Sequence, residues 1–65
     1  MTIEEYWAVV RRLGLKRHAG NVFVTSMGDF YRVTDPTKYT PEERVELIDK
    51  LKIRMGIAPP SGLLN

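Results

Sequence analysis

Between residues 21 and 33 the chain reads NVFVTSMGDFYRV, two runs rich in apolar residues that flank a turn. β-Branched and aromatic residues favour extended backbone, and Gly-Asp favours a reversal of the chain. The segment therefore predicts a β-hairpin, with one strand over residues 21–26 and the other over residues 29–34.

The length of the turn decides which side chains share a face of this hairpin. A two-residue turn at Gly28-Asp29 is favoured, because glycine at the first turn position adopts a positive φ without strain. This register puts Phe23 and Phe30 on one face together with Thr25 and Arg32. The other face then carries four apolar residues, which are Val22, Val24, Tyr31 and Val33. A three-residue turn is the alternative, and it would shift the second strand by one residue and mix these sets.

A capping box marks the start of each of two predicted helices. Thr2 with Glu5 and Thr40 with Glu43 have the Thr-x-x-Glu spacing in which side chains and backbone N–H groups satisfy one another. Apolar residues at helical spacing follow each box, and glycine ends each helix at Gly14 and Gly56. The sequence thus predicts one helix over residues 3–13 and a second between Thr40 and Gly56.

The order helix, strand, strand, helix predicts a small α+β domain of αββα type over residues 1–57. Two helices are expected to pack on one face of the antiparallel hairpin, and residues 58–65 are expected to form a flexible tail. No apolar run approaches the length of a membrane span, and acidic residues stand where a secretory signal would be basic. A cytoplasmic location without membrane contact is the default expectation.

Five potential phosphate contacts are basic residues, four of them around the end of the first helix. They are Arg11, Arg12, Lys16, Arg17 and Arg32. Cations near a helix C-terminus also complement the helix dipole, which accounts for Arg11 and Arg12 without any ligand. The cluster therefore predicts either a patch that binds nucleic-acid phosphates or a solvated helix end.

Apolar residues that fall off the predicted core faces form a second candidate site. Phe23 and Phe30 lie on the uncovered hairpin face, and Ile53 lies off the inner face of the second helix. A chain of 65 residues without cysteine has a core near the lower size limit and no disulfide to support it. These residues are therefore predicted to form a protein interface, with a second copy of the chain or with another protein.

Enzymatic chemistry is not predicted. The paired carboxylates Glu4-Glu5 and Glu42-Glu43 lie in first helical turns, where negative charge is stabilising, and the one histidine is His18. No cofactor motif and no metal-ligand cluster is recognised, so neither a cofactor nor a metal is expected. The first hypothesis is a non-catalytic binding module that self-associates through its hairpin as a homodimer. The alternative is a nucleic-acid-binding accessory protein that uses the basic cluster.

Overall fold

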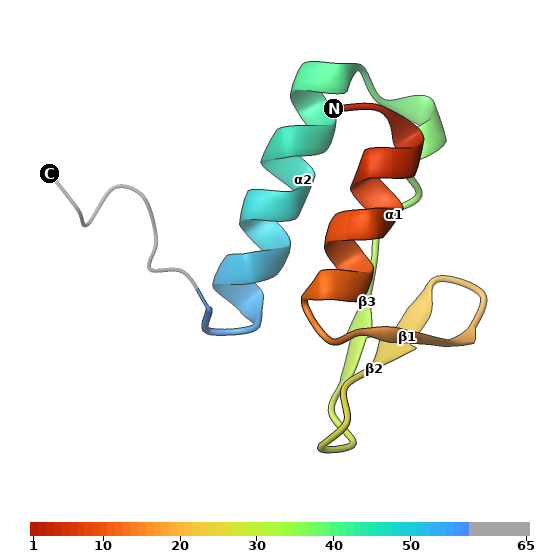
Figure 1. Ribbon diagram of the computed structural model, residues 1–65, viewed down its shortest axis with the longest axis vertical. Coiled ribbons are helices and arrows are strands. Elements are labelled where there is room, and N and C mark those ends of the chain that lie inside the picture. The colour runs from red at the N-terminus through yellow and green to blue at the C-terminus, as the bar shows by residue number, and fades with distance from the viewer. Residues whose placement is uncertain (58–65) are drawn as a thin grey trace, which may run out of the picture.

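The computed structural model describes residues 1–57, which form a small α+β fold of two helices and one antiparallel sheet (Figure 1). The elements in chain order are α1 (Ile3–Arg12), β1 (Lys16–Ala19), β2 (Val22–Val24), β3 (Phe30–Arg32), the 3-10 helix η1 (Pro36–Lys38) and α2 (Pro41–Arg54). The predicted flexible tail at 58–65 lies outside the described residues. Within residues 1–57, no helix has the length and apolar content needed to cross a membrane.

Both predicted capping boxes are present. The Thr2 hydroxyl accepts a hydrogen bond from the Glu5 backbone N–H at 3.1 Å, and the Glu5 carboxylate accepts one from the Thr2 N–H at 2.7 Å. Thr40 and Glu43 form the same pair of bonds, at 3.2 and 2.8 Å. Because each box satisfies two N–H groups that a helix start leaves without partners, it fixes where α1 and α2 begin.

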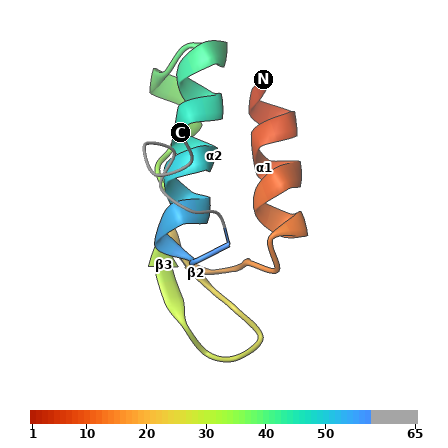
Figure 2. The ribbon, with the colours of Figure 1, turned by 90° about the vertical axis from the view of Figure 1, so that its left-hand side faces the viewer.

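The two helices lie side by side and run in the same direction, with both N-termini at one end of the molecule (Figures 1 and 2). The sheet lies at the other end, near the C-terminus of α1. Half-buried Arg44 on α2 joins the N-terminal ends: its Nε donates to the Pro36 carbonyl at 3.0 Å and its Nη1 to the Met1 carbonyl at 3.2 Å. One guanidinium thus links α2, η1 and the residue that precedes the cap of α1.

The sheet contains a third strand, β1, which was not predicted from the sequence. β1 pairs with β2, so the order in the sheet is β1-β2-β3, and β2 is the central strand. Gly20, with φ of +54°, and Asn21 form the two-residue turn between Ala19 and Val22. The register of β1 against β2 shifts between Arg17 and Ala19, which marks a bulge at His18.

The hairpin of β2 and β3 has the three-residue turn, so the favoured two-residue register is wrong. The Thr25 N–H bonds to the Asp29 carbonyl at 2.9 Å, which leaves residues 26–28 as the turn, and Gly28 has φ of +89°. Phe23 therefore pairs with Tyr31, and Val24 pairs with Phe30. This places Phe23 on the core face and Phe30 on the opposite face, instead of both on the uncovered face.

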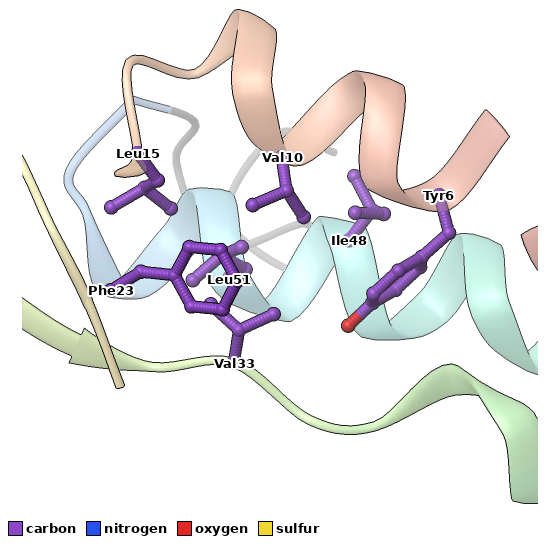
Figure 3. Packing of buried hydrophobic residues seen from close by; sticks show 7 residues of the cluster. All are labelled: Tyr6, Val10, Leu15, Phe23, Val33, Ile48 and Leu51. Carbon is purple, nitrogen blue, oxygen red and sulfur yellow. The ribbon is translucent and has the colours of Figure 1, made fainter. Parts of the chain in front are cut away.

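One apolar core joins the helices to the sheet (Figure 3). Its fully buried members are Tyr6, Val10, Leu15, Phe23, Val33, Ile48 and Leu51. Val22 and Val24, predicted for the core face, are half-buried on the other side, because the three-residue turn exchanges the faces. Tyr6 crosses the core and donates its hydroxyl to the Thr34 carbonyl at 2.8 Å. Loss of hydration at this position raises the pKa of Tyr6 above its ordinary value.

Candidate functional site

A hollow of about 240 Å³ lies between the C-terminal half of α1 and the first two strands. We call it the basic hollow, and its lining residues are Trp7, Arg11, Leu15, Lys16, Arg17 and Phe23. Trp7 and Arg11 are four residues apart and so share one face of α1. Arg17 reaches the hollow from β1 because it pairs with Phe23 of β2. Apolar and cationic groups thus surround one small volume.

Arg17 is held over two aromatic rings of the basic hollow. The rings of Trp7 and Phe23 are stacked, with centroids 5.7 Å apart and planes 18° apart. The guanidinium carbon of Arg17 lies 5.2 Å from the Trp7 centroid and 4.9 Å from the Phe23 centroid, within the range of a cation–π contact. Its Nη1 also donates to the Gly20 carbonyl. A guanidinium has five N–H donors, so this bond uses only part of its capacity to hold an anion.

The structure brings together three of the five predicted phosphate contacts. Arg11, Lys16 and Arg17 all line the basic hollow. Arg12 is exposed at the last position of α1 and does not line it. Arg32 pairs with Val22 in the sheet, is exposed and does not line the hollow.

The three predicted interface residues do not share a surface. Phe23 is 4% exposed in the core, so the prediction that it lies on the uncovered face is wrong. Ile53 is half-buried and lines a second hollow, of about 510 Å³, between α2 and Thr34. Phe30 is 57% exposed on β3 and is the one member that remains on the uncovered face of the hairpin.

Phe30 belongs to a surface that we call the outer sheet face. Its residues are Lys16, His18, Val22, Val24, Phe30 and Arg32. Val24 pairs with Lys16 on one side and with Phe30 on the other, so these three lie in a row across the sheet. The His18 ring meets the Phe30 ring at 73°, with centroids 5.1 Å apart. The centre of this face is apolar and aromatic, and Lys16 and Arg32 supply its positive charges.

Two contributors to these surfaces were not predicted from the sequence. Trp7, which no sequence motif marked as a site residue, is half-buried and lines the basic hollow. β1 was not predicted, although Gly20-Asn21 is a dipeptide typical of two-residue hairpins and was the signal for it. Both failures of prediction have the same cause: Arg17 contacts Trp7 only when β1 is paired with β2.

The described part of the chain holds no cluster of three or more His, Cys, Asp or Glu side chains arranged to bind a metal ion. The chain shows no significant similarity to a known protein family, to a curated protein or to a solved structure. A functional argument therefore depends on the geometry of the basic hollow and the outer sheet face.

Proposed function

We propose that this protein is a non-catalytic binding module that holds the phosphate backbone of nucleic acid at the basic hollow. The observation that carries the proposal is the convergence of Arg11, Lys16 and Arg17 on one hollow with Trp7 and Phe23. Guanidinium and ammonium groups bind phosphate oxygens through charge-assisted hydrogen bonds. An arginine side chain stays charged in proteins, so it serves to hold an anion rather than to exchange protons.

Complementation of the helix dipole explains only part of this cluster. Arg11 and Arg12 both lie in the last turn of α1, where cations are stabilising without any ligand. Lys16 and Arg17 lie beyond the helix in β1, and Arg17 is positioned by its contacts with Trp7 and Phe23. The dipole therefore accounts for neither the position of Arg17 nor its proximity to Arg11.

The first test is a titration that uses Trp7, the single tryptophan of the chain, as the fluorescent reporter. A mixed-sequence oligonucleotide, single-stranded or duplex, should change the Trp7 emission, because the indole lines the basic hollow. Three phosphate contacts predict a slope of about −2.7 for log K against log salt on duplex, or about 40-fold weaker binding at 200 mM than at 50 mM salt. Absence of binding at 50 mM salt would refute the proposal.

Two neighbouring arginines provide a matched pair of variants for the same assay. Arg11→Gln and Arg12→Gln remove the same charge from the same helical turn, but only Arg11 lines the basic hollow. We expect Arg11→Gln to reduce the salt slope by about 1 and Arg12→Gln to leave it nearly unchanged. Equal effects of the two variants would show that net charge, and not the hollow, governs binding.

A second candidate function, self-association, is favoured by the position of β3. The sheet order leaves β3 paired on one side only, and its exposed Phe30 lies beside that free edge. We infer that two copies join their β3 edges, as in strand addition. This arrangement assumes that both helices pack on one face of the sheet. The burial of Phe23 and Val33 with residues of both helices supports that assumption.

The edge-to-edge dimer is tested by sedimentation at tens of micromolar protein. The Val33 N–H donates to the Asn21 carbonyl, on the side of β3 that faces β2. Successive N–H groups along a strand point to alternate sides, so the Arg32 N–H points towards the free edge of β3. Arg32→Pro removes this donor, whereas Arg32→Gln removes only the charge. We expect a dimer of twice 7.5 kDa for the parent chain and for Arg32→Gln, and a monomer for Arg32→Pro. A monomeric parent chain would exclude this candidate.

A further inference from the structure

We propose that the nucleic acid is single-stranded, with one of its bases stacked on Phe30 of the outer sheet face. This inference rests on the proposed function, because the basic hollow would hold the backbone of the same strand. The inference adds the outer sheet face as a second binding surface and specifies single-stranded nucleic acid as the ligand. The starting point is a large aromatic ring that is 57% exposed on a face whose charged side chains include Lys16 and Arg32.

Phe30 is placed as a stacking platform by its neighbours in the sheet. Its pairing partner Val24 lies beside it on the same face, and His18 touches its ring at 73°. Because the rings of His18 and Phe30 meet nearly at right angles, they are not stacked on one another. A base that stacks on an aromatic side chain presents its π-face and not its hydrogen-bonding edge, so the contact does not require a particular base.

Lys16 connects the outer sheet face to the basic hollow. It lines the hollow, and its partner Val24 separates it from Phe30. Two inter-strand spacings put the backbones of Lys16 and Phe30 about 10 Å apart. A strand whose phosphates contact Arg11, Arg17 and Lys16 can therefore continue over β1 and bring a base to Phe30. Arg32, on the same face as Phe30, lies where a following phosphate would pass.

The charges of this face favour an anionic partner over a second copy of the chain. Two outer sheet faces brought together would set Lys16, Arg32 and His18 against the same cationic or ionisable groups. Like charges placed opposite each other at an interface are destabilising. In a duplex, each base is stacked and paired, so Phe30 reaches a base only in an unpaired strand. A single strand fits both the charge and the ring.

The test compares a labelled oligothymidylate with a duplex of the same length by fluorescence anisotropy at 50 mM salt, using the full chain. Phe30→Leu keeps an apolar side chain without a π-face, and we expect it to weaken single-strand binding about tenfold while duplex binding changes less than twofold. Phe30→Trp should retain or improve single-strand binding. Met27→Leu alters the most exposed apolar residue of the same hairpin, 88% exposed at the turn, and should change neither affinity.

The outcomes separate this inference from the proposed function. If Arg11→Gln weakens binding but Phe30→Leu does not, the basic hollow binds nucleic acid and the stacking role of Phe30 is wrong. Equal losses with single strand and duplex after Phe30→Leu would likewise overturn it, since they would indicate a structural effect. If the parent chain binds neither oligonucleotide, both the proposed function and this inference fail. Circular dichroism of each variant establishes that it is folded.

Discussion

Single polar side chains determine where the helices of this protein begin. Thr2 and Glu5 exchange hydrogen bonds with each other's backbone, as Thr40 and Glu43 do. Asp35 plays a related part before η1, because its carboxylate accepts from the N–H and the hydroxyl of Thr37. All these groups are exposed, so their contribution to stability comes from hydrogen bonds to the free backbone N–H groups at the helix starts and not from burial.

The capping hydroxyl of Thr2 can be tested by substitution. Thr2→Ala removes the acceptor of the Glu5 N–H, and we expect a loss of about 1 kcal/mol in the free energy of unfolding, measured by urea denaturation. Thr2→Ser keeps the hydroxyl oxygen that accepts this bond and is the matched control. We expect it to lower the free energy of unfolding much less than Thr2→Ala does. An alanine variant as stable as the parent would contradict the role of the cap.

The same capping groups predict how stability depends on pH. The hydrogen bond from the Thr2 backbone N–H, followed by that of its side chain, lowers the pKa of Glu5, and the bonds from Thr37 lower the pKa of Asp35 in the same way. A carboxyl group whose pKa is lower in the folded state stabilises it above the unfolded pKa and loses that contribution as the pH falls through the folded pKa. The urea midpoint should therefore be flat near neutral pH and should decline below about pH 4.5. In Glu5→Gln the decline should be shallower, and an unchanged profile would contradict the assignment.

At the level of elements, the hairpin register has the largest consequences. The three-residue turn exchanges the faces of β3 relative to β2, and it decides that Phe23 is buried while Phe30 is exposed. The preference of Gly28 for a positive φ fits this turn as well as the shorter one. Burial of Phe23 in the core, where its ring stacks on Trp7 of α1, therefore accounts for the choice, and the sequence of the turn does not.

The register predicts opposite outcomes for the two phenylalanines. Phe23→Ala should lower the free energy of unfolding by about 3–5 kcal/mol, because it leaves a cavity in the core and removes the ring beneath Arg17. Phe30→Ala should change it by no more than about 0.5 kcal/mol, as expected for an exposed side chain. Thermal or urea unfolding of the pair checks both values. Small and similar losses for both variants would instead support the two-residue turn, which places both rings on the uncovered face.

The features predicted correctly from the sequence are those that local residues specify. The helix starts follow from Thr-x-x-Glu spacing and the helix ends from Gly14 and Gly56, whose φ values are +85° and +75°. β1 was not predicted because Lys16–Ala19 is exposed throughout and shows no alternation of apolar and polar residues. Its structure arises from pairing with β2, a contact between segments. The basic cluster was visible in the sequence, but the meeting of Arg17 with Trp7 depended on that pairing.

At the scale of the whole molecule, one core and one polar junction hold the parts together. The core lies between the helices and the sheet, and the Arg44 guanidinium joins the opposite end through the carbonyls of Pro36 and Met1. A chain of this size has few other long-range contacts that could compensate for a loss. The junction should therefore contribute to global stability and not only to local order.

Arg44→Gln tests the junction. We expect the free energy of unfolding to fall by about 1–3 kcal/mol, because a charged donor to two backbone carbonyls is removed. Arg12→Gln is the control, since Arg12 is an exposed cation at the end of α1. We expect this variant to lower the free energy of unfolding by no more than about 0.5 kcal/mol. Equal urea midpoints for the two variants would indicate that the junction does not support the fold.

The parallel course of the two helices separates the start of the chain from the proposed binding surfaces. Met1 lies at the end of the molecule opposite the hairpin (Figures 1 and 2). Anything joined ahead of Met1, whether a fluorescent label, a solid support or further polypeptide, is thus attached on the distal side. A sensor surface coupled there would present β1, β2 and β3 towards the solution, with the proposed ligand path unobstructed.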